Sequence, residues 1–226
     1  MKNFLGMLVF LMLSASVRAQ TDAEMEFSGG MKNTISNRLT ENLEKIEGRY
    51  TLVDEGKRVR YTRVFENLGK TKEELKDGFP NFVRLCDWNE VDIDVSYREE
   101  NETLILTFVV NYGQMGGRSS MAHDYTLYAT ARWRIDYKDN RVRVIADLTD
   151  YTEMHYDKTG LLVKEQKSLV PLVAVPPFGK VKKRKDNEMY GWAFVQCYNN
   201  TMRLFHNLGV SFNSIVKKSP DASTDW

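Results

Sequence analysis

A long run of alternating apolar and polar residues occupies the middle of this 226-residue chain. From Tyr125 to Tyr137 every second residue is apolar or aromatic, and the residues between them are mostly polar. Asp139 and Asn140 then provide a turn signal, after which the alternation resumes over 141–150. Because successive side chains of a strand point to opposite faces, this pattern predicts an antiparallel hairpin with one buried face and one solvated face.

Similar but less regular alternation predicts further strands. We expect them over 57–67, 91–97 and 104–112, with a shorter ribbon over 151–167. Residues 98–101 are expected to turn the chain between two of these strands, and 157–160 to turn the ribbon. The stretch 113–120, GQMGGRSS, is rich in glycine and predicts a flexible hairpin loop.

Three segments have helical spacing of apolar residues. Residues 71–86 open with a capping box of Thr71 and Glu74, and Gly78 and Pro80 should kink or delay the second half of that helix. A second helix is expected from Asp186 to residue 208, with Gly209 just past its end. Its expected buried stripe is Tyr190, Phe194, Cys197, Tyr198, Thr201, Phe205 and Leu208. A third, with a narrower apolar stripe, is expected over 31–46.

Together these elements predict an α+β domain. We expect an antiparallel sheet with helices packed on one face, in the order strand, helix, four strands, helix, plus an N-terminal helix. The expected division is 1–19 signal peptide, 20–56 helical extension, 57–212 main domain with an irregular ribbon and Pro-rich connector over 151–186, and 213–226 flexible tail.

Two stretches carry a resemblance to a known family. They are VFENLGKTKEEL (64–75), where a strand passes into a capped helix, and ATARWRIDYKDNRVRVIADLTDY (129–151), a long strand with a charged turn and return. The chain resembles uncharacterised secreted proteins, common in gut Bacteroidetes, whose domain is described as TATA-binding-protein-like. The resemblance covers roughly 57–156, and Pro80 and the insert at 113–117 depart from it. It implies a fold and an envelope setting, and it carries no catalytic residue.

The N-terminus reads as a secretory signal. Lys2 precedes an apolar run over 4–13, and Val17-Arg18-Ala19 is a small-residue exit, so cleavage is expected before Gln20. The run is shorter than the roughly 20 apolar residues that span a bilayer. We therefore expect a secreted or periplasmic product that does not insert into a membrane.

Charge and composition argue against several functions. Removing Lys2 and Arg18 from the 32 basic residues leaves 30 against 31 acidic ones, so the mature net charge is near −1 and we expect no nucleic-acid partner. The three histidines have no metal-site spacing, and Cys86 lies in no nucleophile signature. We expect no cofactor, no metal and no catalytic residue, which favours a protein that is not an enzyme.

The candidate ligand residues lie in two places. On the polar side of the predicted sheet they are Tyr128, Arg132, Arg134 and Arg143, and in the 113–120 stretch they are Gln114 and Arg118. The plainer interpretation of the arginines is a cross-strand charge ladder against Asp92, Asp94, Asp136 and Asp147. The alternative is a binding face whose guanidinium groups receive carboxylate or sugar groups.

The two cysteines raise a separate possibility. Cys86 and Cys197 fall on the inward stripes of two helices expected on the same sheet face, and an oxidising compartment would allow a disulfide between them. Two buried thiols are the alternative.

The sequence thus favours a secreted or periplasmic, non-catalytic binding or accessory protein. Its expected partner is an envelope protein, a peptide or a glycan. The alternatives are a structural subunit of an envelope assembly, which would show an exposed apolar patch on 31–46 or 168–178, and a hydrolase whose site is assembled from distant residues.

Overall fold

The computed structural model describes residues 35–54, 58–86, 96–166 and 184–215. The predicted signal peptide, most of the Pro-rich connector, Asp92 and Asp94, and residues 216–226 of the predicted tail lie outside the described residues.

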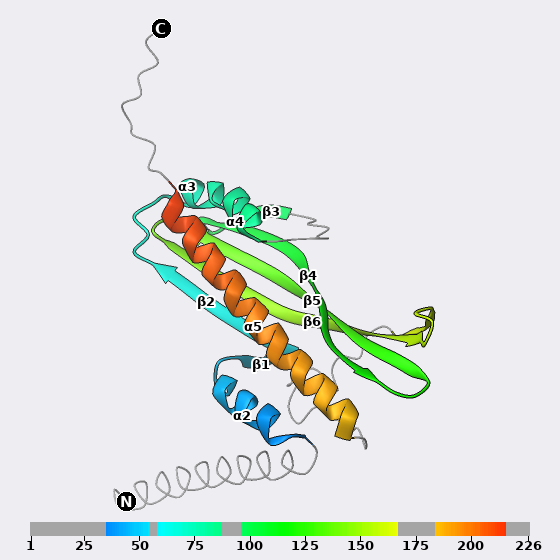
Figure 1. Cartoon of the computed structure of the whole chain (residues 1–226). Helices are drawn as coiled ribbons and strands as arrows, with labels where there is room; N and C mark the ends of the chain where they lie inside the picture. The colour runs from blue at the N-terminus through cyan, green and yellow to red at the C-terminus, as the bar shows by residue number, and fades with distance from the viewer. Residues whose placement is uncertain (1–34, 55–57, 87–95, 167–183, 216–226) are drawn as a thin grey trace, which may run out of the picture.

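A seven-stranded antiparallel sheet dominates the fold (Figure 1). Its strands are β1 (Thr51–Val53), β2 (Arg58–Glu66), β3 (Ser96–Glu100), β4 (Thr103–Ser119), β5 (His123–Lys138), β6 (Arg141–Asp157) and β7 (Leu162–Gln166). Their spatial order is β1-β2-β6-β5-β4-β3, and β7 pairs with the far part of β6. The predicted β5–β6 hairpin is confirmed, as is the α+β class.

The helices lie on one face of this sheet. They are α2 (Asn37–Ile46), α3 (Lys72–Asp77), α4 (Phe79–Leu85) and α5 (Arg184–Ser214). Figure 1 shows α5 crossing the sheet diagonally, with α2 beside its N-terminal half and α4 near its C-terminal end. The opposite sheet face carries the polar residues of the alternating strands, and we call it the polar face.

The predicted interruption of the helix over 71–86 is confirmed. Thr71 and Glu74 form the capping box, with the Thr71 backbone amide donating to Glu74 Oε2 at 2.8 Å. α3 ends at Asp77, and α4 begins at Phe79 with Pro80 in its first turn, where a missing N–H costs no helical bond.

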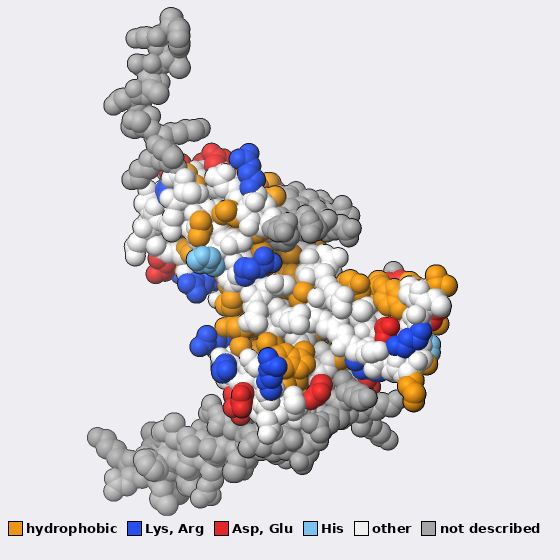
Figure 2. All heavy atoms as spheres, viewed as in Figure 1, with side chains coloured by type: hydrophobic (Ala, Val, Ile, Leu, Met, Phe, Trp, Pro, Cys, Tyr) orange, Lys and Arg blue, Asp and Glu red, His pale blue; other side chains and the backbone are white. Residues whose placement is uncertain are grey.

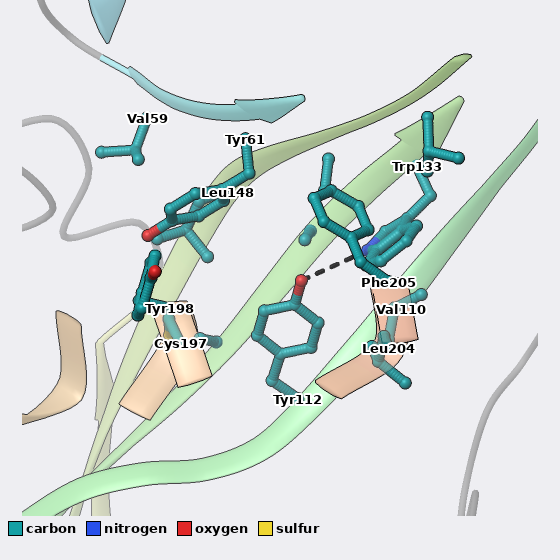
Figure 3. Packing of buried hydrophobic residues seen from close by; sticks show 14 of the residues in the cluster. Val59, Tyr61, Val110, Tyr112, Trp133, Leu148, Cys197, Tyr198, Leu204 and Phe205 are labelled. Carbon is teal, nitrogen blue, oxygen red and sulfur yellow. Dashed lines mark hydrogen bonds between the residues drawn. The ribbon is translucent and has the colours of Figure 1, made fainter. Parts of the chain in front are cut away.

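The core lies between α5 and the sheet. All seven residues of the predicted α5 stripe are buried. Trp133 is fully buried in β5, and its indole N–H donates to the Tyr112 hydroxyl at 3.3 Å (Figure 3). The Tyr112 hydroxyl also bonds Thr201 of α5 at 2.8 Å. These polar atoms satisfy one another inside an otherwise apolar core, as buried hydroxyls must.

The prediction of a loop over 113–120 is wrong. β4 continues to Ser119 and stays paired with β5, with register shifts at Asn111/Gly113 and Gln114/Gly116. Gly113 has φ +73°, a conformation that absorbs an extra residue in a bulge. A Cβ on Gly116 would lie 3.0 Å from the Met189 carbonyl oxygen, so this glycine lets α5 approach the strand. The glycines therefore serve pairing and packing, and the turn falls at 120–122.

The predicted end of the last helix is also wrong. α5 runs past Gly209 to Ser214, and a Cβ at Gly209 would lie 3.0 Å from the Phe65 ring. Gly209 is thus a packing residue within the helix, not its C-terminal cap. Likewise, β3 continues through three residues of the predicted 98–101 turn, and the turn falls at Asn101 and Glu102, which both have positive φ.

Within the described ranges, no helix combines the length and apolar character needed to cross a membrane.

Candidate functional site

The strand register aligns five side chains in a row across the polar face. Pairing of β2, β6, β5, β4 and β3 places Val64, Arg143, Asp136, Ile105 and Arg98 side by side. The next row on the same face contains Ile145 and Arg134, which are paired across β6 and β5. Charged residues and aliphatic residues therefore share one surface.

Asp136 is the centre of this arrangement. The residue is only 4% exposed, yet it carries a carboxylate. Arg134 Nε donates to Asp136 Oδ1 at 2.6 Å, and Arg143 Nε donates to Oδ2 at 2.8 Å, with a second bond from the Arg143 Nη2. A buried carboxylate is costly unless it is paired in this way. Of the predicted cross-strand charge ladder, the structure shows the pair Arg143–Asp136, and Arg134 binds the same carboxylate from within β5.

The same bonds orient the two arginines. Each guanidinium uses its Nε edge to hold Asp136, and within the described part of the chain the Nη groups of Arg134 donate to no other residue. The side chains of Arg134 and Arg143 remain 37% and 51% exposed. Asp136 thus holds two cationic groups in place while leaving donors directed toward solvent.

A pocket of about 450 Å³ lies over these residues. It is lined by Arg98, Glu100, Asn101, Thr103, Ile105, Arg134, Asp136, Lys138, Arg141 and Arg143, and we call it the arginine pocket. Five lining residues are basic and two are acidic, which gives the pocket a positive potential. Ile105 lies beneath it but is only 2% exposed, so it offers almost no surface to a ligand.

Two of the lining arginines are engaged at the rim. Arg98 pairs with Glu100 at 3.5 Å, and Arg141 pairs with Glu66 at 3.3 Å. All four side chains are more than half exposed, so these pairs are weak and exchange readily with solvent.

The other polar-face residues predicted to bind ligand lie outside the pocket. Arg132 precedes Arg134 by two residues and is exposed. Its cross-strand neighbour Asp147 accepts hydrogen bonds of 2.6 and 2.8 Å from Arg60. Tyr128 of β5 pairs with Gln114 of β4. Tyr128 precedes Asp136 by eight residues, so the two lie about 26 Å apart along the strand. The structure therefore brings together Arg134 and Arg143, and it separates Tyr128 and Gln114 from them.

Arg118 lies on the helix side of the sheet. Its Nε is 2.6 Å from Asp186 of α5, and its guanidinium stacks 3.7 Å from the Tyr125 ring centroid. The first contact joins strand β4 to the start of α5 and the second joins it to β5, so we assign Arg118 a structural role.

A polar cluster adjoins Arg118. Tyr190 donates to Glu153 Oε2 at 2.9 Å, and His155 contacts the other Glu153 oxygen and the Tyr125 ring. Desolvation, followed by the charge of Glu153, raises the pKa of the Tyr190 hydroxyl well above its usual value. The members of the cluster satisfy one another.

Sequence reasoning missed Arg98, Lys138 and Ile105 as pocket residues. The register between β3, β4 and β5 brings Arg98 and Ile105 beside Asp136 and Arg134, whereas Lys138 follows Arg134 by four residues on the same face of β5. Alternation gave the face on which each residue lies but not its neighbours on other strands. Among the described residues, no group of three or more His, Cys, Asp or Glu side chains could hold a metal ion.

The possible disulfide between Cys86 and Cys197 is not formed in the structure, which has the alternative arrangement of two buried thiols. Both thiols are buried, but Cys86 lies 3.7 Å from Asn207 and Cys197 lies 3.6 Å from the Tyr151 hydroxyl. Asn207 and Cys197 are ten residues apart in α5, about 15 Å along the axis. A disulfide requires Cα atoms within about 7 Å, so the helix crossing keeps the sulfurs apart.

Comparison with known proteins gives likeness in fold alone. No family model and no curated protein matches this chain. Among solved structures, it is similar to a TBP-like protein from Parabacteroides distasonis ATCC 8503, with 16% identity over 70% of this chain and 95% of the other, at a TM-score of 0.43. It is also similar to a DUF4468 family protein from Bacteroides ovatus ATCC 8483, with 15% identity over 78% and 94% of the two chains and a TM-score of 0.42.

Proposed function

We propose that this chain is a non-catalytic binding protein of the cell envelope that receives an anionic ligand in the arginine pocket. The observation that carries the proposal is the pair of guanidinium groups held by Asp136 through their Nε edges. Donors fixed before the ligand arrives lose little conformational entropy on binding, which favours affinity. Charge-assisted bonds to an anion are also the stronger kind of hydrogen bond.

The composition of the pocket supports binding rather than catalysis. Its ten lining residues include no histidine, cysteine or serine. Arginine does not release its proton near neutral pH, and the one buried carboxylate is committed to two arginines. The envelope setting is supported by the signal-like N-terminus.

The test is calorimetry on residues 20–226 with small anions, including acetate, glucuronate and inorganic phosphate. Arg134→Gln and Arg143→Gln should each weaken binding by about tenfold or more, since each removes a charge-assisted donor. Arg203→Gln is the control, because Arg203 is exposed on α5, across the sheet from the pocket. Equal affinity of all three variants would contradict the proposal.

A structural subunit is the second candidate, favoured by exposed apolar residues at one end of the sheet. The ends of the β4–β5 and β6–β7 hairpins expose Met121 (97%), Leu161 (68%) and Val163 (57%). Hydrophobic side chains lie on this projecting end in Figure 2. The patch expected on 31–46 is not formed by α2, whose Leu39, Leu43 and Ile46 are buried. Sedimentation equilibrium of wild type and Met121→Ser would detect assembly through the hairpin ends.

A further inference from the structure

Resting on the proposed function, we infer that the arginine pocket takes a carboxylate attached to an aliphatic chain, the chemistry of a peptide C-terminus or a fatty acid. Four observations on the polar face lead to this ligand class.

The charge of the site fits a ligand of low charge. Arg134, Arg143 and Asp136 together carry one net positive charge, and the rim arginines are already paired with Glu100 and Glu66. Lys138 adds a second cation at the edge of the pocket. A polyanion needs a long basic surface. Here Asp147 and Asp150 follow on the same face, so one carboxylate matches the field better than a chain of phosphates.

The donors fit a planar acceptor. A guanidinium presents its N–H groups in a flat fork, which matches the two oxygens of a carboxylate in one plane. Because the Nε edges of Arg134 and Arg143 are fixed by Asp136, their outer Nη groups can face a second carboxylate on the solvent side.

Aliphatic side chains flank the guanidinium groups. Val64 pairs with Arg143 and is 37% exposed, and Ile145 pairs with Arg134 and is half-buried. Together they make an apolar surface on the β2 and β6 side of the charged centre. An aliphatic chain lying beside the carboxylate would remove the exposed parts of Val64 and Ile145 from water, which favours binding.

The same surface does not suit a sugar. Sugar rings commonly pack on aromatic side chains, and the pocket lining contains none. The nearest tyrosines of β5 and β6 on this face among the described residues are Tyr128 and Tyr156, and they lie six or more residues along their strands from the pocket arginines. The geometry therefore favours an aliphatic carboxylate over an acidic glycan.

The experiment is calorimetry on residues 20–226 with matched probes. The probes are acetyl-Ala-Leu-Val as the free acid and as the C-terminal amide, octanoate, glucuronate and inorganic phosphate. We expect the free acid, octanoate or both to bind about tenfold more tightly than the amide, glucuronate and phosphate, because only they combine both features. Which of the two binds identifies the source of the carboxylate.

Variants separate the two halves of the site. Val64→Thr keeps the shape of the side chain but adds a hydroxyl. It should weaken binding of the aliphatic acid severalfold and leave the affinity for acetate unchanged. Arg143→Lys keeps the charge but loses the forked N–H donors of the guanidinium group. It should weaken binding of the aliphatic acid and of acetate by about tenfold. Leu52→Thr is the control, because Leu52 of β1 is an aliphatic side chain that is 47% exposed against 37% for Val64. Circular dichroism of each variant shows that the fold is retained.

The failures can be told apart. If the amide, glucuronate or phosphate binds as tightly as the aliphatic acid, the ligand class is wrong while an anion-binding pocket stands. If Val64→Thr weakens binding of acetate as much as binding of the aliphatic acid, Val64 does not contact the aliphatic chain of the ligand. If no anion in the panel binds, the proposed function fails as well.

Discussion

At the scale of single residues, Asp136 decides the character of the polar face. Removing its charge leaves two guanidinium groups side by side without their common acceptor. The same carboxylate therefore serves both stability and the placement of the proposed ligand donors, and a substitution there should affect both.

Asp136→Asn should lower the free energy of unfolding by about 1–3 kcal/mol, the usual cost of losing hydrogen bonds to a charged group. Urea denaturation measures the change. Glu100→Gln is the control, because its ion pair with Arg98 is exposed and should be worth less than about 1 kcal/mol. Equal losses of unfolding free energy in the two variants would show that the buried ion pairs of Asp136 stabilise the fold no more than an exposed pair does.

Cys197 gives a prediction about reactivity. Burial raises the pKa of its thiol to about 12, so almost no thiolate exists at pH 8. In the folded protein we expect negligible reaction with a thiol reagent at pH 8. In non-reducing guanidinium both cysteines should react, whereas fewer than two reactive thiols would indicate a disulfide.

At the scale of elements, local patterns predicted what local physics determines. The β5–β6 hairpin follows from alternation and from the Asp139-Asn140 turn, and the α3–α4 break follows from Gly78 and Pro80. The glycines of β4 and α5 were misread because their role depends on the neighbour across the contact. Neither the Met189 carbonyl near Gly116 nor the Phe65 ring near Gly209 could be known from spacing alone.

Gly191 illustrates the same dependence. It is buried in α5 where α2 docks, and an added Cβ would lie 2.6 Å from Leu39 Cδ2. Gly191→Ala should therefore lower stability by about 1–2 kcal/mol, because overpacking outweighs the gain in helix propensity. In a Leu39→Ala background the same change should stabilise. A double-mutant cycle by thermal unfolding measures the coupling, and additive effects would contradict the contact.

At the scale of the whole molecule, buried tyrosines set the response to alkali. Burial raises the pKa of Tyr61, Tyr112, Tyr137 and Tyr151 in the folded chain. Unfolding exposes these hydroxyls, which then lose protons near pH 10. Stability should be full below about pH 9 and fall as pH rises, by about 1.4 kcal/mol per pH unit for each group.

We therefore expect cooperative unfolding between about pH 10 and 11.5, measured together by circular dichroism and by tyrosinate absorbance. Tyr137→Phe is the matched variant, since within the described chain the Tyr137 hydroxyl makes no hydrogen bond. It should leave stability at pH 7 equal or higher and move the alkaline midpoint upward. Gradual ionisation of all the tyrosines without loss of structure would contradict this account.

The same scale explains how much of the site was predictable. Arg134 and Arg143 were named from their place on the polar side of two strands, and both line the pocket. The place of Arg98 required the pairing of β3 with β4 and of β4 with β5, whereas Lys138 lies four residues after Arg134 on the same strand. A site built across strands depends on register, which a single sequence specifies only through the packing of the complete sheet.

The docking of α2 on α5 has a consequence for the order of events during synthesis. The apolar stripe of α2, the first described helix, packs against α5, the last one. Leu39 is therefore buried only after Gly191 has been synthesised. Until α5 has been made, the helix-facing side of the sheet also lacks its cover. The core can therefore close only when the C-terminal part of the chain is available.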